Sequence, residues 1–594
     1  MNSKNNNVDI NIIRHSLAHI LASAVQELYP GVKFGIGPAI ENGFYYDFDF
    51  SGVKTNSGEE FKLTSEELPK IEAKMKEIIR KEVVFEKKVV SQEEAKEIFK
   101  DQPYKLELIE EMDNKEEISV YKNGNFIDLC KGPHINSTKE IPLESFKLTK
   151  LAGAYWKGDE RNKMLTRIYG LAFKTKEELE EYLKQLKEAE KRDHRFLGKE
   201  LELFMTDERV GQGLIMFLPK GAFIYKKLED YMYKKEFKYG YHYVRTPVLA
   251  LEDLYQKSGH LAHYKDDMYS PIEIEGKNYY LKPMNCPHHH MMFKHTPKSY
   301  RDLPYRLADF GMIHRYERSG TLTGLIRTRN FCQNDAHIYC AKNQVKDEFI
   351  NVLKLFEEVY RDFKIKDYWF ELSLPDYNNK EKYGDIENKE MWEYSANIAR
   401  EAMKEFGAKF EEVEGEAAFY GPKIDVQVRN VFGKKDTIAT IQIDFYMPER
   451  FDLTFVNEKG EKERPVIIHR AIMGSFERFF AFLIEQTGGN FPLWLSPIQV
   501  QVIPISQKFN NYAKSIDDKL RENDIRTELN DSNETLGKKI REGETKKIPY
   551  LLIVGEKEER NKTVRVRKRG EGDIGEMVVD SFISKIKKEE ADLL

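Results

Sequence analysis

The alternation of apolar and polar positions divides the chain into segments of different character. Residues 1–174 mix short strand-like runs with helical ones, which indicates an α+β domain. Residues 175–195 form a highly charged helical stretch with a narrow leucine stripe, and Thr175 and Glu178 have the spacing of a capping box. The stretch therefore fits a linker helix between domains, although an ordinary surface helix would show much the same pattern.

Two further segments follow the predicted linker. Residues 196–496 contain a long series of strands and helices and end in the Gly- and Pro-rich run GGNFPLWLSP. In residues 497–594 the strand-like runs IQVQVIPI, IRTELN and YLLIVG alternate with helical stretches around 508–523 and 535–545, an order typical of an α/β domain. We therefore expect a multidomain α+β protein with three domains and one linker.

Composition is consistent with a globular protein that works in water. The chain has 594 residues, of which 40% are hydrophobic and 33% charged. It contains no uninterrupted apolar run of the roughly 18 residues that a membrane span requires. The polar start MNSKNNNVDINIIRH lacks the apolar centre of a secretory signal. We expect a cytoplasmic protein.

Charge and cysteine content narrow the possible chemistry. The net charge of −5 argues against a uniformly basic nucleic-acid-binding protein, but it does not exclude a local RNA-binding surface. Four cysteines in so long a chain cannot form a disulfide framework. They are better suited to metal binding or to a reactive site. The four are Cys130, Cys286, Cys332 and Cys340.

The segment FGMIHRYERSGTLTGLIRTRNFCQNDAH (310–337) is the most informative in the chain. Two strand-like stretches flank a polar loop; Arg315 follows the first, and Arg327 and Phe331 lie at the start of the second. A guanidinium pairs well with phosphate oxygens, and an aromatic ring can stack on a base. By itself the pattern indicates nucleotide binding only weakly, because surface charge on a hairpin would look similar.

The order of three motifs identifies a family resemblance. The segment 310–337 resembles motif 2 of class II aminoacyl-tRNA synthetases, GSFERF with Arg478 resembles motif 3, and VRTPVL with Pro247 resembles motif 1. The resemblance implies an antiparallel sheet flanked by helices and a homodimer formed through motif 1. Consistently, the sequence contains neither a G-x-x-x-x-G-K-[ST] loop nor a G-x-G-x-x-G run after a strand.

The same resemblance assigns an ATP site. Arg315 would hold the α-phosphate, and Arg327 and Arg478 the γ-phosphate of ATP bound with Mg²⁺. Phe331 would stack on adenine, and Glu317 would contact the adenine or its ribose. Fixed guanidiniums and Mg²⁺ suit the negative charge that develops as a carboxylate attacks the α-phosphorus.

Three residues far apart in sequence suggest a metal site. Cys286 lies in LKPMNCPHHH, His337 in NDAHIYC and His469 in VIIHRAIMGS. One thiolate and two imidazoles suit Zn²⁺ with a fourth position left open, although their spacing alone does not establish a site. All three contexts resemble threonyl-tRNA synthetases, which implies a zinc ion that takes the amine and the hydroxyl of L-threonine together. A site that bonds the hydroxyl rejects valine by roughly 10⁴-fold or more.

The resemblance extends to the remainder of the active site. His260 would lie near the terminal ribose of the tRNA and, with Arg315, Arg478 and Lys423, would serve catalysis. Thr437 departs from the family, where a glutamine that contacts ATP is common, and the run His288–His290 is assigned no metal ligand. The residues implied for the threonine pocket are Met284, Gln333, Asp335, Tyr420 and Gln442.

The first domain carries a second histidine group. HSLAH places His15 and His19 four residues apart on one helix face, and DLCKGPH adds Cys130 and His134. Taken alone, this set is a plausible tetrahedral zinc site. It also resembles the editing domain of bacterial threonyl-tRNA synthetases, which is related to alanyl-tRNA editing proteins that hold a metal there.

Threonyl members of that group are understood to hydrolyse Ser-tRNA with a positioned water and no metal, and we follow them. Such a correction is needed because one methyl group, worth about 1–3 kcal/mol, separates serine from threonine. The histidines would act as general base or position the water, and Cys130 would line the serine pocket. Asp128 would orient a histidine, and Tyr46 and Lys105 would contact the terminal adenosine or the ester.

The last domain is rich in Lys and Arg between 538 and 569, which fits phosphate contact or simply a solvated charged face. Its sequence resembles the anticodon-binding domain shared by threonyl, prolyl, histidyl and glycyl synthetases. The resemblance implies that Asn533, Glu558 and Arg567 read anticodon bases of tRNA(Thr).

Three alternatives remain at this level. A prolyl or seryl enzyme is not expected to combine the Cys/His/His trio with an N-terminal HxxxH domain. An RNA-binding regulator without ligase activity would have no need of Arg315, Arg327 and Arg478. A hydrolase with an RNA module leaves the central residues unexplained. The ubiquitin-like domain with which the family usually begins is expected to be absent.

Overall fold

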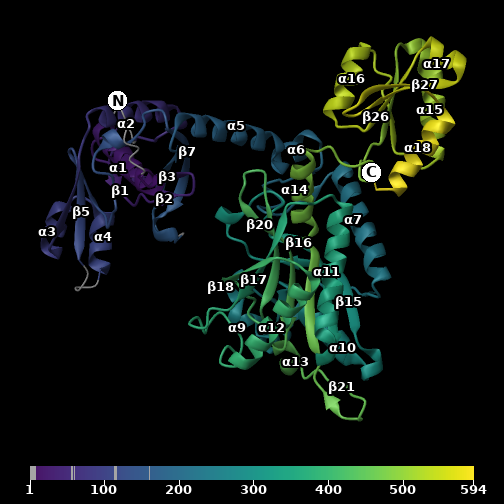
Figure 1. The fold of residues 1–594 in the computed structure, drawn as a ribbon, viewed down its shortest axis with the longest axis horizontal. Coiled ribbons are helices and arrows are strands. Elements are labelled where there is room, and N and C mark those ends of the chain that lie inside the picture. Colours follow the sequence, from purple (N-terminus) through teal and green to yellow (C-terminus); the bar gives the residue numbers. More distant parts are fainter. Residues whose placement is uncertain (1–7, 55–57, 59–60, 113–116, 160, 594) are drawn as a thin grey trace. The chain divides into compact units, whose positions relative to one another are not determined.

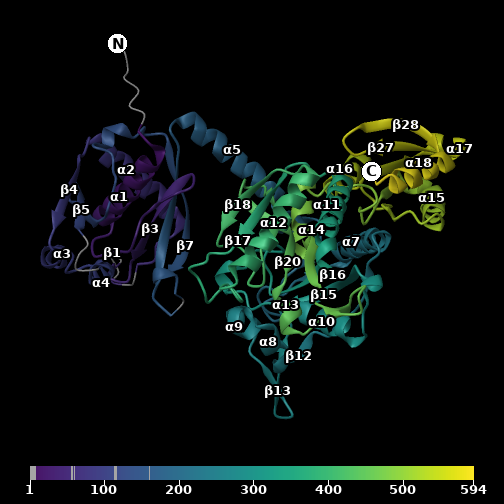
Figure 2. The same cartoon turned by 60° about the horizontal axis from the view of Figure 1, so that its bottom comes forward.

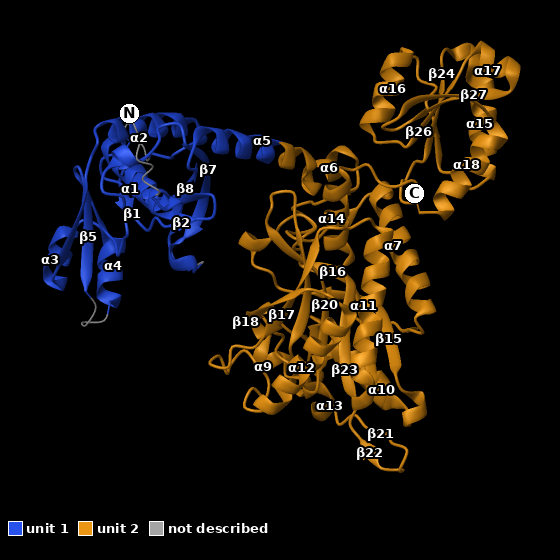
Figure 3. Cartoon of the chain, viewed as in Figure 1, with its two compact units in different colours: residues 1–187 blue, residues 188–594 orange. Residues whose placement is uncertain are grey.

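The computed structural model describes residues 8–54, 58, 61–112, 117–159 and 161–593. They form two compact units, residues 1–187 and 188–594 (Figure 3). The boundary falls inside helix α5 (Lys176–Arg192), the predicted linker helix. The Thr175 hydroxyl accepts the N–H of Glu178 at 3.2 Å, which is one half of the predicted capping box.

Unit 1 is built around helix α1 (Ile10–Leu28), which packs together with helix α2 (Leu68–Arg80) on a five-stranded antiparallel sheet. A second, three-stranded antiparallel sheet lies beside helices α3 (Gln92–Ile98) and α4 (Pro103–Glu111) (Figure 1). The first sheet has the order β1-β3-β8-β7, with β2 beside β3, and its strands are β1 (Lys33–Phe34), β2 (Ala39–Ile40), β3 (Gly43–Asp49), β7 (Phe146–Tyr155) and β8 (Met164–Ala172). The second consists of β4 (Phe85–Val90), β5 (Ile118–Asn123) and β6 (Phe126–Leu129).

Unit 2 contains an eight-stranded sheet in the order β11-β15-β16-β23-β20-β19-β17-β18. Only the two edge pairs, β11 with β15 and β17 with β18, are parallel. Helices α7 (Pro219–Lys238), α11 (Val345–Asp362), α12 (Lys389–Phe406) and α14 (Phe476–Thr487) contribute to its core. The strands are β11 (His242–Tyr243), β15 (Tyr305–His314), β16 (Asn330–Cys340), β17 (Tyr368–Leu374), β18 (Phe410–Glu414), β19 (Lys423–Arg429), β20 (Lys435–Asp444) and β23 (Val466–Ser475). The predicted antiparallel sheet flanked by helices is confirmed.

The register of this sheet brings distant residues together. His337 in β16 lies directly opposite His469 in β23, which in turn lies opposite Gln442 in β20. Directly opposed side chains in an antiparallel pair have Cβ atoms about 5 Å apart. The three segments therefore meet on the sheet, although more than 100 residues separate the first from the others.

The C-terminal part of unit 2 is a separate five-stranded sheet, in the order β25-β24-β26-β27-β28. The predicted strands and helices are confirmed as β24 (Val500–Pro504), β25 (Thr527–Leu529), β26 (Tyr550–Val554), α15 (Asn510–Glu522) and α16 (Leu536–Thr545). These three strands are parallel, whereas β27 (Thr563–Lys568) and β28 (Gly572–Val578) extend the sheet in antiparallel fashion (Figure 2). Helix α17 (Glu556–Asn561) and the last helix, α18 (Val579–Ala591), complete this part. Among the helices of the described residues, none has the length and apolar character to cross a membrane.

Candidate active site and a second histidine cluster

One cavity of about 650 Å³ in unit 2 collects the predicted substrate-binding residues. The central strands of the sheet and the segment 315–331 contribute to its walls. Every residue predicted for ATP, for threonine and for the metal lines this cavity, as does Lys423: Met284, Cys286, Arg315, Glu317, Arg327, Phe331, Gln333, Asp335, His337, Tyr420, Gln442, His469 and Arg478.

Cys286, His337 and His469 bring their sulfur and ring nitrogens within 4.8 Å of one another, and all three residues are buried. Cys286 is the first residue of helix α10 (Cys286–His295), while the two histidines are neighbours on the sheet. The fold thus assembles one thiol and two imidazoles from three distant segments.

The outer nitrogen of each histidine already has a partner. His469 Nε2 lies 2.8 Å from Asp444 Oδ2, and His337 Nδ1 lies 2.7 Å from His289 Nδ1. His289 Nε2 in turn lies 3.7 Å from an oxygen of Asp309. Metal-binding histidines commonly use the second nitrogen in this way, because a carboxylate fixes the tautomer and makes the ligand more basic. The donor set therefore fits a zinc ion with one open position.

Sequence reasoning did not single out Asp444, His289 or Asp309. Asp444 lies two residues after Gln442 in the same strand, so the period of two that puts alternate residues on one face could have identified it. His289 belongs to the run His288–His290, which was assigned no ligand. Within the described residues that run contributes nothing to the cluster, and His289 instead supports His337.

Polar side chains surround the trio. The Tyr420 hydroxyl donates to Gln442 Oε1, and the Tyr420 ring stacks on His469 with centroids 4.7 Å apart. The Asp335 carboxylate accepts a hydrogen bond from the Asn285 amide at 3.0 Å. Lys423 Nζ lies 3.0 Å from Asp425 Oδ2. These contacts fix polar groups that can recognise the ammonium, carboxylate and hydroxyl of an amino acid.

The same cavity concentrates guanidinium groups. Arg315 lies over the Phe331 ring at 5.2 Å, and Arg327 Nε donates to Glu317 Oε2 at 2.7 Å. Arg478 donates to the carbonyls of Ile326 (3.1 Å) and Thr437 (3.0 Å). Burial and the nearby Arg315 lower the pKa of Arg478, because unbalanced positive charge is costly out of water. Such a group of arginines suits a polyphosphate.

Two predicted positions have notable surroundings. The Thr437 hydroxyl donates to Gln427 Oε1 at 2.9 Å, while its backbone carbonyl holds Arg478. His260 is fully buried, with Nδ1 2.7 Å from the Ser258 hydroxyl, and is not among the lining residues. Burial and the nearby Arg315 lower the pKa of His260 to about 3.

A second cluster lies in unit 1. His15 and His19 of α1 meet Cys130 and His134, which follow strand β6. Cys130 Sγ lies 3.3 Å from His15 Nε2 and 3.3 Å from His134 Nε2. The four side chains offer ligand atoms within 4.8 Å of one another, so this donor set is also compact enough for a metal.

The surroundings of the second cluster combine a carboxylate with a cation, and Asp128 Oδ2 lies 3.5 Å from His19 Nε2. The Asp128 carboxylate also lies 2.5 Å from Lys105 Nζ and accepts the Tyr46 hydroxyl at 2.7 Å. His15 Nδ1 lies 3.2 Å from the Pro133 carbonyl oxygen. All seven residues predicted for editing are therefore brought together. His134 Nδ1 lies 3.1 Å from the hydroxyl of Ser16, which sequence reasoning missed although it follows His15 directly.

Burial sets the protonation of this cluster. It lowers the pKa of His15, His19 and His134, and it raises the pKa of the Cys130 thiol to about 11. Near neutral pH the imidazoles are therefore uncharged and can accept a proton from water. The protonated sulfur is a poor nucleophile.

The residues predicted to read an anticodon differ in accessibility. Asn533 is exposed, Arg567 lies 3.5 Å from Glu544, and the Glu558 carboxylate accepts the Gly555 N–H at 2.9 Å. Several basic residues of this domain already have acidic partners. These pairs are Lys538–Glu534, Lys546–Glu528, Arg565–Asp573 and Lys568–Glu571. Recognition of anticodon bases by Asn533, Glu558 and Arg567 stays a prediction.

Three segments of the chain match known protein families. Residues 269–487 match the tRNA synthetase class II core domain (G, H, P, S and T), and residues 499–589 match the anticodon binding domain. Residues 118–169 match the threonyl and alanyl tRNA synthetase second additional domain.

Whole-chain relatives are similar along nearly the full length. The chain is 50% identical over 583 residues to a threonine–tRNA ligase of Geobacillus sp. (strain WCH70), covering 98% of this chain and 88% of the relative. Identity is also 50% to a threonine–tRNA ligase of Anoxybacillus flavithermus, covering 98% and 89%. A crystal structure described as the RNA binding domain of threonyl-tRNA synthetase from Cryptosporidium parvum superimposes with a TM-score of 0.63 at 39% identity, covering 67% of this chain and 98% of that one.

Proposed function

Because the chain belongs to the threonine–tRNA ligase family, we propose that the cavity of unit 2 activates threonine and that the cluster of unit 1 removes serine from mischarged tRNA. The family joins threonine to tRNA with ATP, and the domain matched in unit 1 supports the editing step. The single observation that carries the assignment of residues is the convergence of Cys286, His337 and His469 in one cavity, which is also lined by the three arginines predicted for ATP.

Activation requires that the threonine carboxylate attack the α-phosphorus of ATP, releasing pyrophosphate. Arg315 would neutralise charge on the α-phosphate as it develops, while Arg327 and Arg478 hold the γ-phosphate and the adenine stacks on Phe331. Mg²⁺ bound with ATP would share this charge. The chain contributes position and electrostatics, so no protein nucleophile is needed.

Selection of threonine would depend on zinc held by Cys286, His337 and His469. When bound, the ion would supply a Lewis acid open to both the amine and the side-chain hydroxyl, and valine lacks that hydroxyl. Asp335, Gln333 and the Tyr420–Gln442 pair would orient the amino acid. Asp444 and His289 would hold the two imidazoles in the ligating orientation.

Hydrolysis of seryl-tRNA would use the neutral histidines of unit 1. A water held by His15 or His134 would lose its proton to the imidazole as its oxygen attacks the ester carbonyl carbon, and the imidazolium would pass that proton to the terminal ribose oxygen as the ester bond breaks. Lys105 and Tyr46 would contact the ester or the terminal adenosine. Asp128 would keep His19 and Lys105 in place.

The remaining assignments concern partners. Residues 497–594 would bind the anticodon of tRNA(Thr), and the motif 1 segment with Pro247 would form a homodimer in the cytoplasm. His260 and Lys423 would assist transfer to the tRNA.

Amino-acid-dependent ATP–pyrophosphate exchange tests the activation step with the protein alone. Threonine should support exchange, serine should support it more weakly, and valine should not. Exchange with valine at the level of threonine would overturn the selection mechanism. Exchange that survives removal of zinc would do the same.

A further inference from the structure

A third group of acidic and imidazole side chains lies outside both clusters. Asp193, His194 and Glu485 are buried and bring ligand atoms within 4.8 Å of one another. The Asp193 carboxylate is already engaged, because it accepts the backbone N–H of Arg195 at 2.7 Å and pairs with the Arg195 guanidinium at 2.6 Å. The group is therefore better explained as a hydrogen-bond network than as a metal site.

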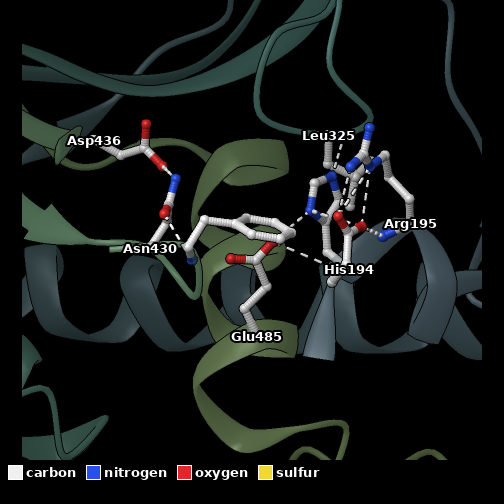
Figure 4. Close-up of polar contacts among 8 residues, drawn as sticks. His194, Arg195, Leu325, Asn430, Asp436 and Glu485 are labelled. Atoms are coloured by element: carbon white, nitrogen blue, oxygen red, sulfur yellow. Dashed lines mark hydrogen bonds and ion pairs between the residues drawn. The ribbon is translucent and has the colours of Figure 1, made fainter. Parts of the chain in front are cut away.

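His194 links three separate parts of unit 2 (Figure 4). It is the first residue of helix α6 (His194–Glu200), shortly after the linker helix, and is 1% exposed. Its Nδ1 lies 2.7 Å from Glu485 Oε1 in α14, the helix that carries Arg478. Its Nε2 accepts the backbone N–H of Leu325 at 3.1 Å.

These contacts fix the tautomer of the imidazole. A backbone N–H can only donate, so Nε2 must be the nitrogen without a proton. The proton then lies on Nδ1 and is donated to Glu485. The imidazole therefore donates to Glu485 in helix α14 and accepts from the backbone of Leu325, and in this way it joins the helix to the loop.

The loop fits closely against this ring. Gly324 has φ +47°, and a Cβ at that position would lie 2.2 Å from His194 Nε2. Leu325 is 1% exposed, and the next carbonyl, that of Ile326, accepts Arg478 Nε at 3.1 Å. Arg327 follows and lines the cavity. Three consecutive residues therefore join His194, Arg478 and the phosphate-binding region.

We propose that His194 is a positioning residue for ATP: held by Glu485 through Nδ1, it accepts the Leu325 N–H at Nε2 and so sets the loop from which Arg327 emerges and the carbonyl that orients Arg478. This inference rests on the proposed function, since it assigns those arginines to ATP. His194 acts on nucleotide binding rather than on threonine, whose pocket it does not touch.

Two amide variants separate the two hydrogen bonds. The His194→Gln side chain can place an oxygen where Nε2 accepts from Leu325, whereas the shorter His194→Asn side chain can only replace the Nδ1 donor to Glu485. Both put an amide into the same buried site, so a purely structural role predicts similar losses. Positioning predicts that His194→Asn raises the KM for ATP about tenfold in pyrophosphate exchange, with the KM for threonine within about twofold of wild type. His194→Gln should raise the KM for ATP less than about threefold.

Thermal unfolding of each variant and seryl-tRNA deacylation, which uses unit 1, check that the chain remains folded. Equal KM values for ATP in the two variants, or an equal rise in the KM for threonine, would overturn the proposal. Should His194→Asn fail to fold, His194→Ala asks the same question, because it also removes the acceptor of the Leu325 N–H and should raise the KM for ATP selectively. If the unaltered protein shows no threonine-dependent exchange, the proposed function fails, and calorimetric titration of ATP into wild type and His194→Asn still tests the inference.

Discussion

Two clusters of histidine and cysteine, one in each unit, offer a metal nearly the same donors but differ in what lies behind them. In unit 2 both histidines of the cluster have a carboxylate behind them. His469 contacts Asp444 directly, and His337 contacts His289, whose other nitrogen lies 3.7 Å from Asp309. In unit 1 the Asp128 carboxylate lies 3.5 Å from His19 Nε2, but it also pairs with the Lys105 ammonium at 2.5 Å. There the outer nitrogen of His15 faces a carbonyl oxygen and that of His134 a hydroxyl.

This difference indicates that donor identity alone does not define a metal site. A divalent cation gains from anionic neighbours, and an ammonium 2.5 Å from the Asp128 carboxylate works against it. The surroundings of unit 1 instead keep imidazoles neutral and supply donors for an ester. We therefore expect zinc in unit 2 and metal-free hydrolysis in unit 1.

Cys286→Ser should show the largest effect. Loss of a direct ligand should cost more in threonine-dependent exchange than the roughly 10–100-fold that an outer-shell change costs. Deacylation of seryl-tRNA should stay at the wild-type rate, because unit 1 is unaltered. Exchange at the wild-type level in this variant would contradict a role of the metal in threonine activation by unit 2.

His15→Ala should have the complementary effect. Removing a general base typically lowers the rate by about 10²–10⁴-fold, here in seryl-tRNA deacylation measured with pre-charged tRNA. Pyrophosphate exchange provides the matched control and should not change. Unaltered deacylation would exclude His15 from the mechanism.

Asp444→Asn removes only the negative charge of the side chain that contacts His469. The amide can still contact His469, but it no longer stabilises the ligating tautomer as strongly, so zinc affinity should fall about 10–100-fold. Competition with a chelator measures this change. An affinity equal to wild type would mean that the carboxylate is not what distinguishes the two clusters.

The pH profile of deacylation should show the smallest effect. Burial lowers the pKa of His15, so the neutral base persists as pH falls and is lost only below the ordinary histidine range. The deacylation rate should therefore stay nearly constant between about pH 8 and pH 6.5. The pH profile of His15→Ala serves as the reference, because that variant keeps the groups that surround His15. These groups are His19, His134, Lys105 and Asp128. A halving of the rate near pH 7 would contradict the assigned protonation state.

The sequence predicted the three residues proposed to bind zinc, which the fold brings together, but it did not predict the residues behind them. Cys286, His337 and His469 were found because each lies in a distinctive short motif, and the antiparallel sheet followed from the order of the three class II motifs. Asp444 and His289 act through contacts set by sheet register and helix placement, so no local pattern named them as partners. The same holds for Ser16 and His194, whose partners lie more than 100 residues away.

The linker region illustrates the limit most clearly. Its pattern predicted a charged helix, which is found as α5, but the polar run just beyond it gave no sign that His194 is buried against Glu485 and Leu325. A histidine beside charged residues ordinarily indicates a solvated surface. Only tertiary packing reveals its partners.

Metal content, measured by mass spectrometry on three proteins, tests the central contrast most directly. We predict one zinc per chain in the wild type and in Cys130→Ser, and none in Cys286→Ser. Two metal ions per chain in the wild type, or zinc that survives Cys286→Ser and is lost in Cys130→Ser, would contradict it.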